Sequence, residues 1–183
     1  MGRIILKVDS NIALRQYIVS DSEAIFQLID NSRDHLSQHG DTTAQKYQTT
    51  EAVRDSIANP KNSERLRFGI WDKNVFVGTI NITPNEDEEG KPVAEIGYFL
   101  GECYQGKNYL TKSLARLIQY AFFEMNILMV YAFVAQENKR SANVLIRAGF
   151  QDEAPLNNQR RFYLEKNNGA YAHYCSQGDL PCI

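Results

Sequence analysis

The stretch "YFLGECYQGKNYLTKSL", residues 98–114, joins a strand-like run to a helix-like run through a polar loop. The N–H groups in the first turn of a helix lack intrahelical partners, and together with the helix dipole they favour an anion beside the loop. Gly106 lets a ligand come close to the backbone, Lys107 adds positive charge, and Thr111 adds a hydroxyl. The stretch therefore predicts a phosphate-binding loop or, as the alternative, a β–α turn that binds nothing.

Neither of two familiar nucleotide signatures is present in this loop. The pattern GxxxxGK[ST] is absent, so NTP hydrolysis has no support, and the dinucleotide pattern GxGxxG is absent as well. Asn108 occupies the position where a second glycine would be expected. The identity of the ligand therefore depends on the sequence around the loop.

Hydrophobic periodicity and turn residues predict the elements around this stretch. Strands are predicted at residues 12–18, 66–71, 75–82, 93–101 and 127–135, with two more flanking "NNG" (167–169). Helices are predicted at residues 20–36, 49–59, 110–125 and 138–149. Residues 93–135 then form a β–α–β unit. We therefore predict an α/β protein with a mixed sheet and helices on both of its faces.

The composition is typical of a globular protein, with 183 residues, 43% hydrophobic and 23% charged. A net charge of −2 gives no argument for a nucleic-acid partner, and no apolar run is long enough to span a bilayer. The apolar segment near the N-terminus is too short for a signal peptide. Three cysteines without CxxC spacing predict no metal site and favour a reducing compartment, so we expect a cytoplasmic protein.

The chain is predicted to form one domain over residues 1–176, because no linker or repeat interrupts it. Residues 177–183 read as a C-terminal tail, which offers a contact for a possible homodimer.

A second motif, "QENKRSANVLIRAGF" (136–150), follows the strand at 127–135. Asn138 and Ser141 lie three residues apart at the start of a helix, where one can cap the helix while the other faces the space beyond the strand ends. That space is where α/β proteins bind ligands. Together, "EIGYFLGECYQGKNYLTKSLARLIQYAF" (95–122) and "VYAFVAQENKRSANVLIRAGF" (130–150) resemble the core of the GNAT superfamily of acyl-CoA-dependent N-acyltransferases. Their spacing is most similar to the RimJ/RimL-like branch, over about residues 93–153.

The resemblance implies the GNAT fold, with a mixed, mostly antiparallel central sheet, and acetyl-CoA as the cofactor. In this family the loop binds the pyrophosphate of coenzyme A through backbone N–H groups. The implied cofactor-binding residues are Gln105, Gly106, Lys107, Asn108, Tyr109, Leu110 and Thr111 in the loop, Phe99, Leu100 and Gly101 in the strand before it, and Asn138 on the far side.

Two positions depart from the family's loop pattern, with Asn108 in place of a glycine and Leu110 in place of a glycine or alanine. Larger residues than glycine occur at the second position in the RimL-like branch. Asn is the residue after glycine that best tolerates positive φ. We therefore expect Asn108 to adopt φ > 0 or to direct its N–H toward the pyrophosphate.

The resemblance also implies three catalytic candidates, Glu95, Ser141 and Glu153. N-acetylation requires a deprotonated amine and a stabilised thiolate leaving group. Glu95 stands where related enzymes often carry a base, and the alternative is a surface carboxylate. Ser141 is a candidate to protonate or orient the thiol, or only caps its helix. Glu153 would bind or deprotonate the incoming amine.

The resemblance predicts an N-acetyltransferase that joins acetyl-CoA and a primary amine in a ternary complex. The acceptor is a protein N-terminal α-amine or a small-molecule amine, entering from the side of the sheet opposite the cofactor. The alternative is a non-catalytic module that binds acyl-CoA as a sensor or partner domain. His35 and His39 show no partner in the sequence and are expected to be structural or solvent-exposed.

Overall fold

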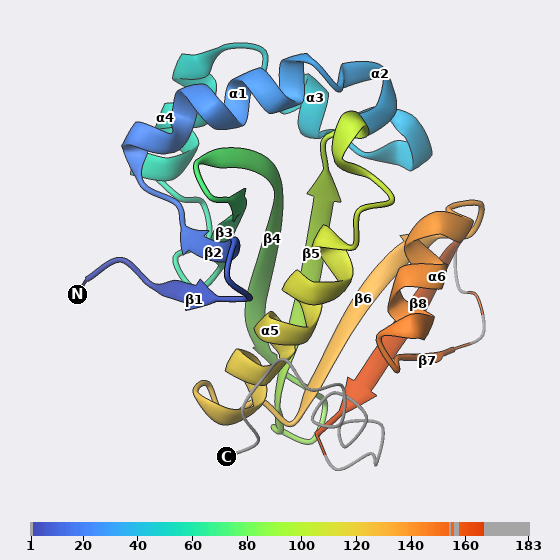
Figure 1. The fold of residues 1–183 in the computed structure, drawn as a ribbon. Coiled ribbons are helices and arrows are strands. Elements are labelled where there is room, and N and C mark those ends of the chain that lie inside the picture. Colours follow the sequence, from blue (N-terminus) through green and yellow to red (C-terminus); the bar gives the residue numbers. More distant parts are fainter. Residues whose placement is uncertain (1, 154, 156–157, 167–183) are drawn as a thin grey trace.

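Eight strands form one sheet in the part of the chain that the structure, a computed structural model, describes: residues 2–153, 155 and 158–166 (Figure 1). The strands are β1 (Ile5–Lys7), β2 (Ile12–Gln16), β3 (Leu66–Asp72), β4 (Val75–Glu86), β5 (Pro92–Leu100), β6 (Met129–Ala135), β7 (Gln151–Asp152) and β8 (Gln159–Glu165). Their order in the sheet is β1-β2-β3-β4-β5-β6-β8-β7. Only β5 and β6 pair in parallel among these strands, which confirms a mixed, mostly antiparallel sheet.

Helices cover both faces of this sheet, as predicted (Figure 1). The helices are α1 (Ser22–Asp30), α2 (Arg33–Leu36), α3 (Thr43–Lys46), α4 (Thr50–Ala58), α5 (Tyr109–Phe123) and α6 (Lys139–Arg147), with the 3-10 turns η1 (Val19–Asp21), η2 (Gln38–Gly40) and η3 (Glu102–Tyr104). Strand alternation separates the two layers. Phe68 of β3 is buried with the apolar stripe of α5, whereas Trp71 of the same strand packs with α1 to α4 on the other face.

The parallel pair β5 and β6 is joined only near its beginning. Residues 93–95 pair with residues 129–131, although β5 continues to Leu100 and β6 to Ala135. Figure 1 shows the two strands diverging toward their C-terminal ends. Each strand keeps its other neighbour, β4 for β5 and β8 for β6. The divergence therefore leaves a gap inside the sheet, with an unpaired strand edge on either side.

The predicted helix at residues 20–36 is interrupted. The structure ends α1 at Asp30 and begins α2 at Arg33, because Ser32 leaves the helical region at φ −129°. The buried Ser32 hydroxyl instead accepts a hydrogen bond from the backbone N–H of Glu102, at 3.2 Å. This tertiary contact, which joins the connection between α1 and α2 to the loop after β5, has no signal in local sequence periodicity.

Two further expectations differ from the structure or lie outside it. The sequence prediction missed β1, whose three residues pair with β2 and are too few to show a period. The "NNG" turn at 167–169 lies outside the described residues, as does the boundary between the domain and its tail. The sheet's last described strand, β8, ends at Glu165 and is preceded by β7.

Candidate active site

The loop between β5 and α5 presents a row of backbone donors. Gly106 has φ 75° and Asn108 has φ 60°, so the expected positive φ of Asn108 is confirmed. Of the residues that the structure describes, none accepts a hydrogen bond from the backbone N–H groups of residues 106–111. The first intrahelical contact comes from Lys112, whose N–H donates to Asn108 O. Six consecutive donors at a helix N-terminus form a cradle for an anion.

Hydrogen bonds fasten the start of this loop and the first turn of α5. Glu102 donates to Ser32, and the side chain of Gln105 hydrogen-bonds the imidazole of His35 on α2. Tyr109, the first residue of α5, donates its hydroxyl to Asp72 Oδ2 at 2.6 Å, and this hydrogen bond raises the pKa of Tyr109 to about 12. Residues 106–108, the part of the donor row that lies between these anchors, are exposed.

The edge of β5 that faces the gap offers further backbone groups. Gly101 donates its N–H to Val77 O on β4, so the predicted contact through this N–H is already used inside the sheet. Because backbone direction alternates along a strand, Phe99 also faces β4 and Leu100 faces the gap. Of the predicted strand positions, Leu100 therefore has the best-placed backbone for a ligand that lies along β5.

Asn138 and Ser141 lie at the start of α6, on the other side of the gap. The side chain of Asn138 caps the helix by accepting a hydrogen bond from the N–H of Ser141, at 3.0 Å. The hydroxyl of Ser141 is 2.8 Å from the hydroxyl of Tyr98 on β5. Asn138 is therefore the residue that caps α6, and Ser141 is the one whose side chain faces β5.

Glu95 lies on the opposite face of the sheet, which carries α1 to α4. It is exposed, and it pairs along the sheet with Tyr131 at the last position where β5 and β6 are joined. Burial, and after it the charge of Glu95, raises the pKa of Tyr131, whose hydroxyl accepts from Asn85 at 2.9 Å. Glu95 therefore stands at the inner end of the gap.

Glu153 reaches the same face through an ion pair. Its carboxylate is 3.0 Å from Arg161 Nη1, and the guanidinium of Arg161 lies 4.9 Å from the ring centre of Tyr131. The exposed ring of Phe133 packs edge-on against Tyr131 with centroids 5.7 Å apart. The structure thus groups Glu95, Glu153, Arg161 and two aromatic rings on one side, and the donor row and Ser141 on the other.

A sequence comparison identifies the family. The acetyltransferase (GNAT) domain family matches residues 11–151. The chain belongs to this GNAT family. The loop supports the family's acyl donor independently, because its unpaired N–H groups suit a pyrophosphate. The chain is accordingly an acyltransferase that uses acetyl-CoA, as the sequence predicted.

Individual relatives agree with the GNAT assignment. The probable N-acetyltransferase YjcK of Bacillus subtilis is 30% identical over 148 residues, covering 78% of this chain and 81% of the relative. The ribosomal-protein-serine acetyltransferase of Escherichia coli is 23% identical, covering 79% and 82%. The structure of RimL, a ribosomal L7/L12 alpha-N-protein acetyltransferase in complex with coenzyme A, superposes with a TM-score of 0.78 at 21% identity, covering 88% of this chain and 98% of RimL. This superposition confirms the fold.

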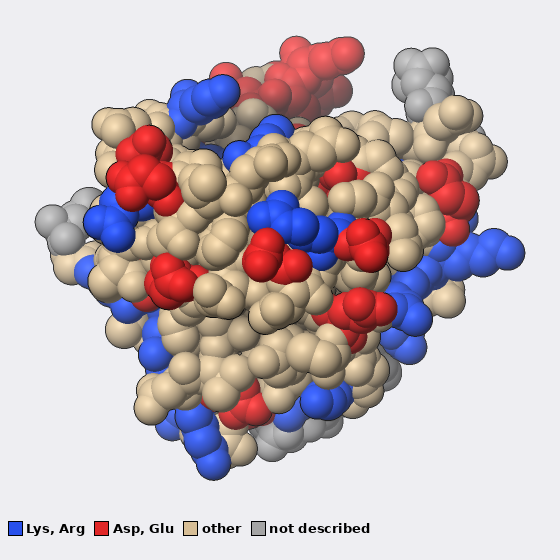
Figure 2. All heavy atoms as spheres, turned by 90° about the horizontal axis from the view of Figure 1, so that it is seen from above, with Lys and Arg blue, Asp and Glu red and all other residues tan. Residues whose placement is uncertain are grey.

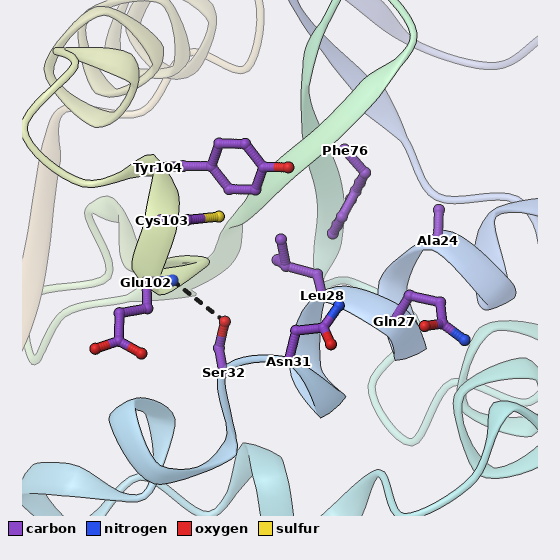
Figure 3. Close-up of a pocket in the computed structure, with 9 residues that line it drawn as sticks. All are labelled: Ala24, Gln27, Leu28, Asn31, Ser32, Phe76, Glu102, Cys103 and Tyr104. Atoms are coloured by element: carbon purple, nitrogen blue, oxygen red, sulfur yellow. Dashed lines mark hydrogen bonds between the residues drawn. The ribbon is translucent and has the colours of Figure 1, made fainter.

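The GNAT core also carries a cavity of about 390 Å³ behind the loop (Figure 3). It is lined by Ala24, Gln27 and Leu28 on α1, Asn31 and Ser32 between α1 and α2, Phe76 on β4, and Glu102, Cys103 and Tyr104 on η3. The thiol of Cys103 points toward its interior. None of the catalytic or cofactor-binding residues predicted from the sequence lines this cavity, so the proposed chemistry takes place elsewhere.

Surface charge and the search for other sites add little to this picture. On the face that carries α1 to α4, acidic and basic side chains are interspersed, so neither sign dominates (Figure 2). Among the described residues, no helix is long and apolar enough to cross a membrane. The same residues contain no group of three or more His, Cys, Asp or Glu side chains that is arranged to hold a metal ion.

Sequence reasoning did not foresee several contacts around the site. His35 and His39 contact residues on the two sides of the gap. His35 contacts Gln105 after β5, and His39 Nδ1 lies 3.6 Å from Glu137 Oε1 after β6. The contact of Tyr98 with Ser141 and the ion pair of Arg161 with Glu153 were not predicted either. Both histidines meet residues at least 70 positions away, and such contacts leave no local pattern.

Proposed function

We propose that this acetyltransferase modifies the N-terminal α-amine of a protein, with a ribosomal protein as the first candidate. The observation that carries the proposal is the position of Glu95 at the inner end of the gap, on the face opposite the row of N–H donors. An acyl donor held by the loop would meet an amine arriving from the face of Glu95. Support for the acceptor comes from the relatives, which include Escherichia coli acetyltransferases for ribosomal-protein serine and for uS5 alanine.

Glu95 is assigned as the general base, acting directly or through a water molecule. Its carboxylate is exposed, and among the described side chains it has no hydrogen-bond or ion-pair partner that would occupy it. An amine that arrives protonated must lose a proton before its nitrogen can attack. A positioned base typically contributes 10²- to 10⁴-fold to such a step.

Glu153 is assigned to binding of the incoming ammonium group. Arg161 Nη1 contacts both oxygens of its carboxylate, and each oxygen keeps a second lone pair that can accept a hydrogen bond from an ammonium group. The rings of Tyr131 and Phe133 beside it provide an apolar surface for the first side chain of a peptide. The pair therefore serves recognition of the acceptor more than proton transfer.

The remaining predicted residues serve the acyl donor. The N–H groups of residues 106–111 would hold the pyrophosphate, and Leu100 would pair with the arm that runs along β5. Asn138 keeps its amide N–H₂ group available for the cofactor, because only its oxygen caps α6. Ser141 is assigned to the leaving sulfur, to which its hydroxyl donates a hydrogen bond. Acetyl-CoA itself supplies the activated thioester.

Peptides with defined amines test this proposal. One set begins with serine or alanine and lacks lysine, and a matched set has a blocked N-terminus and one internal lysine. We expect only the first set to gain one acetyl group, as measured by mass spectrometry. Mass detection is preferable to a thiol reagent, because the exposed Cys103 would react with that reagent. Acetylation of the blocked, lysine-containing set alone would overturn the proposed acceptor.

The alternative acceptor is a small-molecule amine, which the open, acid-containing face also admits. A polyamine and an aminoglycoside in the same assay distinguish the two acceptors by their ratio of kcat/KM. We further propose a cytoplasmic site of action, which a ribosomal acceptor requires, and a homodimer. The C-terminal tail that suggested the homodimer lies outside the described residues.

A further inference from the structure

A hydrogen bond between two hydroxyl groups spans the gap between β5 and β6, from Tyr98 on β5 to Ser141 at the start of α6. Tyr98 lies on β5 three residues beyond Glu95, the last position paired with β6, and Ser141 lies on the first turn of α6. Their oxygens are 2.8 Å apart. β5 and β6 are no longer paired at Tyr98. The hydrogen bond between the two hydroxyls therefore connects β5 to α6 where the sheet provides no connection.

The hydroxyl of Tyr98 has no hydrogen-bond partner other than Ser141 among the described residues. Tyr98 packs with the main core against α5, where a phenylalanine ring would fill the same volume. Its hydroxyl contacts only Ser141, at Oγ and more distantly at the backbone oxygen, 3.4 Å away. Burial raises the pKa of Tyr98 to about 12, so the hydroxyl keeps its proton at any working pH.

The direction of this hydrogen bond decides what Ser141 can do. A serine hydroxyl has one proton and two acceptor positions. When Tyr98 donates to Ser141 Oγ, the serine proton is released from that contact and can point into the gap. Donation from Tyr98 also polarises the serine hydroxyl, because hydrogen bonds in a chain strengthen one another. The backbone of Ser141 is meanwhile held by Asn138, so its side chain starts from a fixed point.

We propose that Tyr98 is a positioning residue, which donates to Ser141 and thereby aims the serine proton at the sulfur of coenzyme A. This inference rests on the role assigned to Ser141 under the proposed function. No bond is made or broken by the two hydroxyls, since each keeps its proton and only the hydrogen bonds change. The effect is strongest when the sulfur is a thiolate, because hydrogen bonds to charged groups are the stronger ones.

The test compares calorimetric binding of coenzyme A with binding of desulfo-coenzyme A, which lacks the sulfur, at pH 7 and pH 9. The ratio of the two affinities isolates the sulfur, and raising the pH increases the share of coenzyme A whose sulfur is a thiolate. In the native protein we expect the ratio to rise with pH. Ser141→Ala should abolish this increase in the affinity ratio. Tyr98→Phe should make the increase about threefold smaller, which corresponds to roughly half of the free energy of a hydrogen bond to a charged group.

Tyr17→Phe is the matched control. Tyr17 is partly buried like Tyr98, its pKa is also raised to about 12, and its hydroxyl donates to that of Thr79 at 2.6 Å, but it packs against the cluster beneath α1. It should leave the affinity ratio unchanged. The double variant Tyr98→Phe, Ser141→Ala should match Ser141→Ala alone, and urea unfolding shows that each variant is folded.

Three results would overturn the inference. A normal ratio in Tyr98→Phe with a lost rise in Ser141→Ala would reject Tyr98 while leaving the role of Ser141 intact. A normal ratio in Ser141→Ala would reject the proposed role of the serine and its positioning together. An equal loss in Tyr98→Phe and Tyr17→Phe would show a general loosening of the fold. If Tyr98→Phe does not fold, Ser141→Thr keeps a hydroxyl that Tyr98 can reach, and loss of the rise in that folded variant counts against the inference.

Discussion

The carboxylate of Glu153 accepts two hydrogen bonds from Nη1 of Arg161, at 3.0 and 3.2 Å, while Glu95 on the same face has no such partner among the described side chains. This difference separates two carboxylates that were both candidates for deprotonating the amine on the sequence alone. The carboxylate of Glu153 is already in contact with a cation, whereas that of Glu95 is open to an incoming amine or a water molecule. The two residues should therefore respond differently to neutralisation.

We predict that Glu95→Gln lowers kcat by about 100-fold or more, with little change in the KM for acetyl-CoA. Glu153→Gln should mainly raise the KM for the acceptor, by about tenfold, because it removes an ammonium contact. Steady-state kinetics with an N-terminal peptide measure both. A larger loss of kcat in Glu153→Gln than in Glu95→Gln would reverse the assignment of the base.

The backbone of Asn108 gives a second prediction. At φ 60° an asparagine is tolerated, a glycine is comfortable, and a β-branched residue is strained by about 1 to 3 kcal/mol. Asn108→Gly should leave acetyl-CoA binding unchanged or slightly tighter, and Asn108→Val should weaken it by about tenfold. Calorimetry with coenzyme A measures the binding. Strong weakening in the glycine variant would show that the asparagine side chain itself contacts the ligand.

The contacts of α2 and η2 give a third prediction. His35 holds the loop before α5 through Gln105, and His39 reaches Glu137 before α6, so the short segment between them spans the gap. Replacing both histidines with alanine should raise the Kd for coenzyme A by about three- to tenfold, because two side-chain contacts that fix the loops are lost.

Asp34→Ala is the control for this double variant, since Asp34 is exposed on α2 and none of the described residues hydrogen-bonds or ion-pairs with it. Calorimetric affinities that are equal in the double variant and the control would show that the segment does not hold the site.

A fourth prediction concerns stability at high pH. Burial raises the pKa of Tyr17 to about 12 from about 10 in the unfolded chain. The stability that depends on this protonated group is complete below pH 10 and is lost as the pH rises toward 12, where the unfolded chain binds fewer protons. For one such buried group the loss is about 2 to 3 kcal/mol.

Urea unfolding between pH 9 and pH 12 measures this loss. Tyr17→Phe should flatten the decline by the share of one tyrosine, and Tyr98→Phe should do the same because its pKa is raised to a similar value. If the free energy of unfolding falls with pH in both variants as steeply as in the native protein, neither tyrosine has a raised pKa in the folded state.

The sequence was informative where the signal is local. The helix of α5, the strands on either side of it and the left-handed Asn108 all follow from periodicity, turn chemistry and residue type. The break after α1 was not predictable, because Ser32 accepts a hydrogen bond there from the backbone N–H of Glu102, 70 positions away. The link between Tyr98 and Ser141 has the same character, since hydroxyls on separate elements show their partners only in three dimensions.

The gap between β5 and β6 has a thermodynamic consequence for the whole protein. The sheet is joined across its middle only at residues 93–95 and 129–131, so it lacks the backbone hydrogen bonds that a fully paired β5 and β6 would make. A ligand that fills the gap can take the place of those bonds, and a ligand at a hundred times its Kd stabilises a protein by about 2.7 kcal/mol. Under the proposed binding mode, in which the acyl donor fills the gap, acetyl-CoA also stabilises the fold, and the amount of folded enzyme should rise with its concentration.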